Sequence, residues 1–170
     1  MKQIALQSKA SQDKFELWKL LDLLSNNPPK KILEVGVDKG YLCQTWRLAF
    51  PNAEVIGIDI SDRDLVYKDF NFILSDSHDF NTRDNLLAND HVSFDLIFID
   101  GDHSLEGVRK DYELYGPLIA PGGVIAFHDI NNGYIEGVDV RILFDEIKKK
   151  FANIEISNPL TGPGIGCIFL

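Results

Sequence analysis

The chain has 170 residues, 45% of them hydrophobic and 25% charged, and it carries a formal net charge of −9 at pH 7. This length suits a single domain that buries on the order of 70% of its unfolded surface and has no room for a separate substrate domain. The negative charge argues against DNA, RNA and acidic membranes as partners, because such partners are bound through lysine and arginine. No signal peptide is visible and no apolar run approaches a membrane span of about 18 residues, so we predict a cytoplasmic protein.

The first 29 residues are predicted to form a helical segment in front of the core of the domain, residues 30–170. Phe15, Trp18 and Leu21 recur at helical spacing, which predicts a helix over residues 11–25 with Ser11 as its N-terminal cap. The sequence NNPPK then ends this helix, because proline lacks the N–H that a helix interior requires.

The stretch KILEVGVDKGY, residues 31–41, predicts a buried strand, a turn with glycines at positions 36 and 40, and a helix that runs to Phe50. Such a junction presents free backbone N–H groups at the carboxyl edge of a sheet, where open α/β folds bind nucleotide-like ligands. Glu34 stands at the end of the strand, where its charge disfavours a pyrophosphate and suits a ligand with a positive group. The turn therefore predicts a nucleotide-like ligand that carries positive charge.

The dinucleotide pattern G-x-G-x-x-G is the alternative interpretation of this turn. Counted from Gly36, the positions of its second and third glycines hold Asp38 and Tyr41. The pattern fails twice, which disfavours an NAD-dependent oxidoreductase.

Two further strands are predicted over residues 55–60 and 72–74. Asp59 ends the first of them, 23 residues beyond Gly36. An acid at about this distance accepts hydrogen bonds from ribose hydroxyls in nucleotide-binding folds; the alternative is that it caps the following helix. A polar loop after the second strand contains Asp76 and Ser77, and Thr82 is the expected cap of a short helix that ends at residue 88.

The second half of the chain contains two buried strands that end in polar clusters. The remaining elements, in chain order, are a strand over 94–99, a helix over 104–118, a turn at 121–123, a strand over 124–127, a loop over 131–137, a helix over 138–151, and strands over 154–157 and 165–170. The last two strands are expected to form an antiparallel hairpin at the sheet edge. Cys43 and Cys167 are predicted to be buried, unpaired thiols.

The polar clusters are Asp100-Gly101-Asp102-His103 after one strand and His128-Asp129 after the next. If the two strands are parallel neighbours, Asp100 and Asp129 can converge on a hard cation that prefers oxygen ligands. Such a cation would lower the pKa of a bound hydroxyl. His103 is placed to accept the hydroxyl proton; the alternative is a loop histidine that caps the helix beginning at Ser104.

These motifs together resemble a known family. The sequence E-x-G-x-x-x-G at the turn resembles the first motif of class I S-adenosylmethionine (SAM)-dependent methyltransferases, with Asp38 in place of the middle glycine. The stretch from 94 to 129 resembles small sugar and natural-product O-methyltransferases with the pattern D-G-x-H, V-x-x-D, L-x-x-G-G and H-D. The matching positions are Asp100, Gly101, His103, Val108, Asp111, Leu118, Gly122, Gly123, His128 and Asp129. The resemblance covers roughly residues 30–170.

The resemblance implies an α/β fold: a Rossmann-like, doubly wound, seven-stranded and mostly parallel sheet with one antiparallel strand near its edge. It also implies SAM as cofactor, with Glu34 near its amino group, Asp59 on the ribose, and the loop of Asp76 and Ser77 on the adenine. The full set of cofactor-binding residues is Glu34, Gly36, Val37, Gly40, Asp59, Ile60, Asp76, Ser77 and Asp100. His103 and Asp100 are the predicted catalytic residues.

The implied metal is Mg²⁺, with Asp100, His128 and Asp129 as its ligands. In metal-dependent relatives an acid or amide beside the last of these aspartates completes the site, but here the neighbours of Asp129 are His128 and Ile130. The third ligand could equally be Asp102, Asn131 or water. Asp111 is expected to be a structural partner of a neighbouring loop and not a catalyst.

The predicted function is methyl transfer from SAM to a hydroxyl group of a sugar or small metabolite, with no nucleic-acid or membrane partner; a homo-oligomer is left open. Acceptor specificity is expected to lie in the N-terminal segment and in the loops at 130–137 and 162–166. The alternative is a catalytically idle SAM-binding module that acts with a partner protein. The combination of Asp100, His103 and Asp129 counts against it, because an idle module needs no such convergence.

Overall fold

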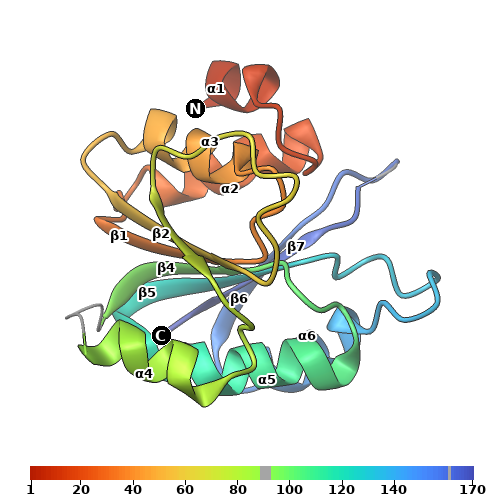
Figure 1. Ribbon diagram of the computed structural model, residues 1–170. Helices are drawn as coiled ribbons and strands as arrows, with labels where there is room; N and C mark the ends of the chain where they lie inside the picture. Colours follow the sequence, from red (N-terminus) through yellow and green to blue (C-terminus); the bar gives the residue numbers. More distant parts are fainter. Residues whose placement is uncertain (89–92, 161) are drawn as a thin grey trace.

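A seven-stranded sheet forms the centre of the computed structural model, which describes residues 1–88, 93–160 and 162–170 (Figure 1). The strand order is β3-β2-β1-β4-β5-β7-β6, and only β7 runs antiparallel to its two neighbours among the described strands. The strands are β1 (Lys31–Val35), β2 (Glu54–Asp59), β3 (Asn71–Leu74), β4 (Phe94–Ile99), β5 (Ile119–His128), β6 (Ala152–Ile156) and β7 (Ile165–Phe169). The predicted fold class and the predicted C-terminal hairpin are therefore confirmed.

Helices cover both faces of the sheet (Figure 1). One face carries α1 (Lys2–Gln7), α2 (Lys14–Leu24) and α3 (Tyr41–Ala49), and the other carries α4 (Phe80–Ala88), α5 (Leu105–Tyr115) and α6 (Val140–Ile147). A short 3₁₀ helix, Gly116–Leu118, follows α5. None of the helices in the described ranges has the length and apolarity needed to cross a bilayer.

The central strands are apolar along their length because both of their faces are buried. In β4, Leu96 and Phe98 pack into the core beneath α1–α3, whereas Ile97 and Ile99 pack into the core above α4–α6. Cys43 and Cys167 are both buried and unpaired, as predicted. Burial of both strand faces leaves the strand ends as the places where polar side chains of the sheet can reach solvent.

Parallel pairing brings the carboxyl ends of the central strands to one edge. Val35 of β1 pairs with Ile99 of β4, and Ile99 pairs in turn with Phe127 of β5. The strand order reverses between β1 and β4, and open α/β sheets bind their ligands at such a switch point. The residues that follow these three strands therefore lie side by side.

The N-terminal segment differs from its prediction. Its first helix, α1, was not predicted, and α2 begins at Lys14 and not near Ser11. The cap is Asp13, whose Oδ1 accepts hydrogen bonds from the N–H groups of Phe15 at 2.9 Å and Glu16 at 3.1 Å. An aspartate followed three residues later by a glutamate is a sequence signature of a helix start, so this signal was present.

Three other boundaries also differ. Helix α4 begins at Phe80, and Thr82 is not its cap: its hydroxyl donates to the Asp76 carbonyl instead. The segment 121–123 is an irregularity within β5 and not a turn before it, because the pairing with β4 shifts at this point. Helix α6 covers only the middle of the range predicted for it.

A buried acid joins the N-terminal segment to the loop between β6 and β7. The Glu16 carboxylate accepts hydrogen bonds from the backbone N–H groups of Asn158 at 2.7 Å and Gly164 at 3.1 Å. This loop and the loop between β5 and α6 extend outward at one end of the sheet (Figure 1). Leu160 and Tyr134, one in each loop, are 88% and 83% exposed.

Candidate functional site

A cleft of about 1080 Å³ opens at the carboxyl ends of the central strands. Every residue that was predicted to bind the cofactor lines it, except Gly40. The predicted catalytic residue His103 and the predicted metal ligands also line it. The strand ends thus bring together residues that are far apart in the sequence.

The turn after β1 requires glycine at both of its ends. Gly36 has φ 86°, and a Cβ there would lie 2.2 Å from the carbonyl oxygen of Asp100. Gly40 has φ 78°, and a Cβ there would lie 2.4 Å from the carbonyl oxygen of Tyr67. Gly36 lets the turn approach the end of β4, while Gly40 shapes the entry to α3 without lining the cleft.

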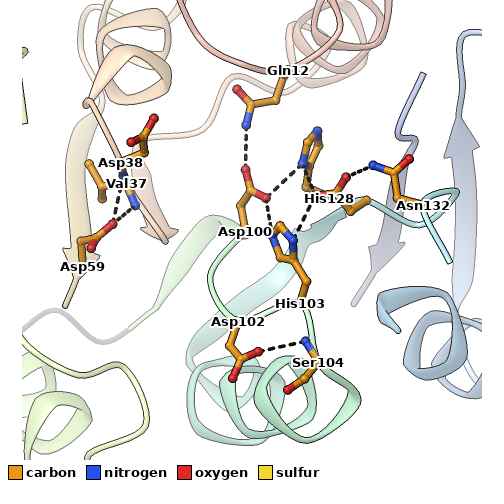
Figure 2. Close-up of polar contacts among 11 residues, drawn as sticks. Gln12, Val37, Asp38, Asp59, Asp100, Asp102, His103, Ser104, His128 and Asn132 are labelled. Carbon is orange, nitrogen blue, oxygen red and sulfur yellow. Dashed lines mark hydrogen bonds and ion pairs between the residues drawn. The ribbon is translucent and has the colours of Figure 1, made fainter. Parts of the chain in front are cut away.

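Asp38 stands where the methyltransferase motif described above has its middle glycine, and the turn still forms. Its φ of 49° lies in the left-handed region, which aspartate tolerates better than most residues. Asp59 Oδ2 accepts hydrogen bonds from the N–H groups of Val37 at 2.8 Å and Asp38 at 2.9 Å (Figure 2). Asp59 Oδ1 accepts from Ser61 N–H, and no helix follows β2 directly, so the helix-cap interpretation of Asp59 is wrong. Asp59, at the end of β2, therefore stabilises the turn that follows β1.

Two side chains of helix α5 contact the loop between β3 and α4. The Tyr115 hydroxyl donates to the Ser77 carbonyl at 2.7 Å, and Asp111 Oδ1 lies 3.5 Å from His78 Nε2. Asp111 is fully buried and also lies under Gly101, where an added Cβ would come within 3.2 Å of its Oδ2. Asp111 is therefore a partner of a neighbouring loop, as expected, and it contacts two loops that border the cleft.

Replacing Asp111 by asparagine is expected to make the free energy of unfolding less dependent on pH between about 4 and 7. Burial raises the pKa of the Asp111 carboxyl to about 6. The folded chain then holds a proton that the unfolded chain releases near pH 4, so wild-type stability falls as the pH rises through this window, by up to about 3 kcal/mol. Urea unfolding at several pH values measures the slope. The exposed Glu113→Gln on the same helix is the control, and equal slopes in Asp111→Asn and wild type would contradict the prediction.

Two carboxylates and two imidazoles meet at the ends of β4 and β5 (Figure 2). Asp100 Oδ1 lies 3.1 Å from His103 Nε2 and 3.0 Å from His128 Nδ1. Asp129 Oδ2 lies 3.0 Å from His128 Nδ1 and 3.4 Å from His103 Nδ1. Each histidine therefore bridges both carboxylates.

The charges of this cluster shift the pKa values of its members. Burial lowers the pKa of His128, but the charges of Asp100 and Asp129 and the hydrogen bonds to them outweigh burial and raise it to about 10. The hydrogen bond to Asp100 raises the pKa of His103. Burial raises the pKa of Asp100, but the two histidines outweigh burial and lower it. Without a bound cation, the carboxylates and imidazoles stabilise one another as ion pairs.

Two amide side chains that sequence reasoning missed support the cluster (Figure 2). Gln12 Nε2 donates to Asp100 Oδ2 at 2.7 Å, and Asn132 Nδ2 donates to Asp129 Oδ1. Gln12 is only 4% exposed, and its Oε1 is buried without a partner in the described part of the chain. Gln12 lies between α1 and α2, 88 residues from Asp100, so no local pattern could have indicated the contact.

Two alternative metal ligands are directed elsewhere. The Asn131 amide donates to Ser157 Oγ at 2.8 Å, and Asp102 Oδ1 accepts from Ser104 N–H at 2.9 Å. The start of α5 is capped by Ser104, whose hydroxyl accepts from Gly107 N–H, whereas the His103 ring faces the carboxylates. Asn131 and Asp102 are therefore not placed to complete a metal site, and His103 does not cap the helix.

Comparison with known proteins assigns the chain to a family. A family model described as a methyltransferase domain matches residues 33–130, more than half of the chain. The chain belongs to this methyltransferase family.

The sequence identity of the chain to individual relatives is low. The chain is 28% identical over 119 residues to mycinamicin VI 2''-O-methyltransferase from Micromonospora griseorubida, a match that covers 65% of this chain and 30% of the relative. The chain spans about a third of the length of the curated relatives it matches.

Solved structures share the fold. An O-methyltransferase from Bacillus cereus in complex with SAH superposes with a TM-score of 0.70 at 16% identity, covering 96% of this chain and 84% of that one. The MycE methyltransferase in complex with Mg, SAH and mycinamycin VI superposes with a TM-score of 0.65 at 19% identity, covering 88% of this chain and 48% of that one.

Proposed function

We propose that the protein transfers the methyl group of SAM to a hydroxyl oxygen of a sugar or another small hydroxylated metabolite. The observation that carries the proposal is the cluster of Asp100, His103, His128 and Asp129 in the same cleft as the glycine turn. The proposal is supported by the methyltransferase family and by the similarity to mycinamicin VI 2''-O-methyltransferase and to a 3'-O-methyltransferase named for a rhamnosyl-tetracenomycin. A homo-oligomer stays a prediction.

The cleft suits the methionine end of SAM. Glu34 is buried at its floor, where Oε2 accepts hydrogen bonds from Trp46 Nε1 at 2.8 Å and Cys43 Sγ at 3.3 Å. Within the described ranges no hydrogen bond reaches Glu34 Oε1, so this atom is available for the ligand's ammonium group. Because Gly36 has no side chain, a ligand in the cleft can approach the backbone of the turn closely.

The nucleoside end fits the opposite part of the cleft. Asp59 Oδ1 can accept from ribose hydroxyls while Oδ2 holds the turn. Asp76 and Ser77 border the space for the adenine, and the 74%-exposed side chain of Ile60 offers an apolar surface to the ring. In this proposed orientation the sulfonium lies near the ends of β1 and β4.

The reaction follows from this placement. His103 Nδ1, which at 3.4 Å from Asp129 is the less tightly held of the two ring nitrogens, accepts the proton of the acceptor hydroxyl when it is unprotonated, and the hydroxyl oxygen attacks the methyl carbon opposite the sulfur. The carbon–sulfur bond breaks, its electron pair stays on sulfur, and SAH leaves as a neutral thioether. Asp100 and Asp129 orient the His103 ring and stabilise it once it is protonated.

The donor set also fits a divalent cation. The ligand atoms of Asp100, His103 and Asp129 lie within 4.8 Å of one another, and His128 Nδ1 lies between the two carboxylates. We propose the ligand set of the sequence prediction, in which Asp100, Asp129 and His128 would hold the ion. When bound, a cation would polarise the acceptor hydroxyl and lower its pKa.

Calorimetric titration with SAM, followed by a methyl-transfer assay on a panel of sugars and glycosides, tests the proposal. We expect SAM and SAH to bind, and NAD not to bind. Absence of SAM binding would overturn the proposal. SAM binding without transfer to any member of the panel would favour the idle binding module instead.

Replacing Asp38 by glycine is expected to change the Kd for SAM by less than about threefold. The Asp38 side chain is exposed, and glycine adopts the same left-handed backbone conformation. Calorimetry measures the change. A tenfold loss of affinity would mean that the carboxylate contacts the ligand, and a tenfold gain would mean that it obstructs the cleft.

A further inference from the structure

His128 occupies the position of a third ligand between Asp100 and Asp129. Its Nδ1 lies 3.0 Å from Asp100 Oδ1 and 3.0 Å from Asp129 Oδ2. Adjacent ligands of a six-coordinate ion with bonds of about 2.1 Å stand about 3 Å apart. Both distances from His128 Nδ1 therefore match the spacing of neighbouring ligands before any ion is bound.

The outer oxygen of each carboxylate is held by a neutral amide. Gln12 Nε2 donates to Asp100 Oδ2, and Asn132 Nδ2 donates to Asp129 Oδ1. These hydrogen bonds leave Asp100 Oδ1 and Asp129 Oδ2 as the inner donors, and both oxygens face His128 at 3.0 Å and His103 at the longer distances of 3.1 and 3.4 Å. Outer partners that orient metal-binding carboxylates in this way are typical of metal sites.

The two histidines differ in exposure, which suggests a division of roles. The side chain of His128 is 8% exposed, whereas that of His103 is 32% exposed. A buried ring suits a fixed ligand, and a more open ring suits proton exchange with an acceptor in the cleft. His128 is thus the better nitrogen ligand, and His103 remains available as the base.

A nitrogen ligand changes which metals the site prefers. Mg²⁺ takes oxygen ligands, whereas imidazole suits later transition metals such as cobalt and zinc. We propose that His128 is a direct ligand and gives this site a preference for a transition dication such as Co²⁺ or Zn²⁺ over Mg²⁺. The proposal rests on the proposed function for the role of the ion, but metal binding can be measured without turnover.

Titration of metal-stripped protein with Co²⁺ and Mg²⁺ by calorimetry tests the proposal. We expect Co²⁺ to bind the wild type at least 100-fold more tightly than Mg²⁺. Because Co²⁺ outcompetes Mg²⁺ at many oxygen sites as well, the deciding quantity is the change in this ratio. In His128→Asn, which offers an amide oxygen, the ratio should fall at least tenfold.

His103→Asn is the matched control, and its ratio should stay within about threefold of the wild type. An unchanged ratio in His128→Asn, or a loss of preference in His103→Asn alone, would overturn the assignment of His128. A second measurement needs no variant: NMR of the Co²⁺-loaded wild type should show a hyperfine-shifted imidazole N–H signal from a coordinated histidine, and its absence would overturn the proposal.

The outcomes for metal and cofactor are separable. If SAM binds but neither metal does, the metal-site proposal fails and the proposed function stands. If Co²⁺ binds with the expected preference but SAM does not bind, the proposed function fails while the assignment of His128 stands.

Discussion

Replacing His103 by alanine is expected to lower kcat by about 10²- to 10⁴-fold, the usual contribution of general acid–base catalysis. The Kd for SAM should change by less than about threefold, because His103 faces the two carboxylates and not the glycine turn. Steady-state kinetics at saturating SAM and acceptor measure the first quantity, and calorimetry measures the second.

The matched control for this variant is His78→Ala, which removes a histidine from the same cleft. His78 lies on the loop between β3 and α4, next to Asp111, so its loss should weaken SAM binding more than it slows methyl transfer. Unchanged turnover in His103→Ala would remove this residue from the mechanism. A similar fall in kcat in both variants would point to a general disturbance of the cleft.

Replacing Glu34 by glutamine is expected to weaken SAM binding by about 10- to 100-fold at pH 8, which corresponds to the loss of a buried charge-assisted hydrogen bond. Burial raises the pKa of Glu34 to about 8, and the charges of Asp100 and Asp59 add to this increase. In the free protein the carboxyl is mostly neutral at pH 7 and must release a proton to pair with an ammonium group. The wild-type Kd for SAM should therefore fall as the pH rises from 6 to 8, by up to about tenfold per unit.

Ionisation of Glu34 favours SAM binding but lowers the stability of the ligand-free protein. Between pH 4.5 and about 8 the folded chain holds a proton on Glu34 that the unfolded chain releases, so the free energy of unfolding of the ligand-free protein falls as the pH rises through this window. Glu34→Gln removes this dependence and should unfold at a higher urea concentration than the wild type at pH 8. The variant is thus expected to be more stable and to bind SAM less tightly.

Calorimetry in two buffers of different ionisation enthalpy detects the proton that SAM binding releases at pH 7. Asp38→Asn is the control, since it removes an exposed charge from the same turn and should leave both pH dependences in place. A wild-type Kd that is independent of pH between 6 and 8, or proton release that persists in Glu34→Gln, would contradict the role of Glu34.

The strand ends were predictable because their geometry follows from local patterns. Buried apolar runs mark β1, β4 and β5, and parallel strands align their carboxyl ends, so the residues after each run had to meet. Asp100, His103 and Asp129 could be grouped in this way without any knowledge of packing. The same logic placed Glu34 and Asp59 beside the glycine turn.

Other features depend on tertiary structure or on backbone angles that no pattern encodes. Gln12 reaches Asp100 only because the segment between α1 and α2 folds back over the sheet. Asn132 lies in a polar loop whose residues look alike in sequence, and the neighbouring Asn131 points elsewhere. The tolerance of Asp38 rests on a left-handed φ that aspartate shares with glycine.

The contact between Gly36 and the backbone of Asp100 bears on how the protein could be re-engineered. The glycine turn and the loop after β4 touch through main-chain atoms, so they form a unit in which a change to one displaces the other. The loops that carry Tyr134 and Leu160 expose these two side chains, but the first also carries Asn132, which holds Asp129, and the second carries Asn158, which binds Glu16. A loop graft that keeps Asn132 and Asn158 should therefore alter the acceptor preference of the proposed enzyme while the glycine turn and the cluster around Asp100 and Asp129 stay in place.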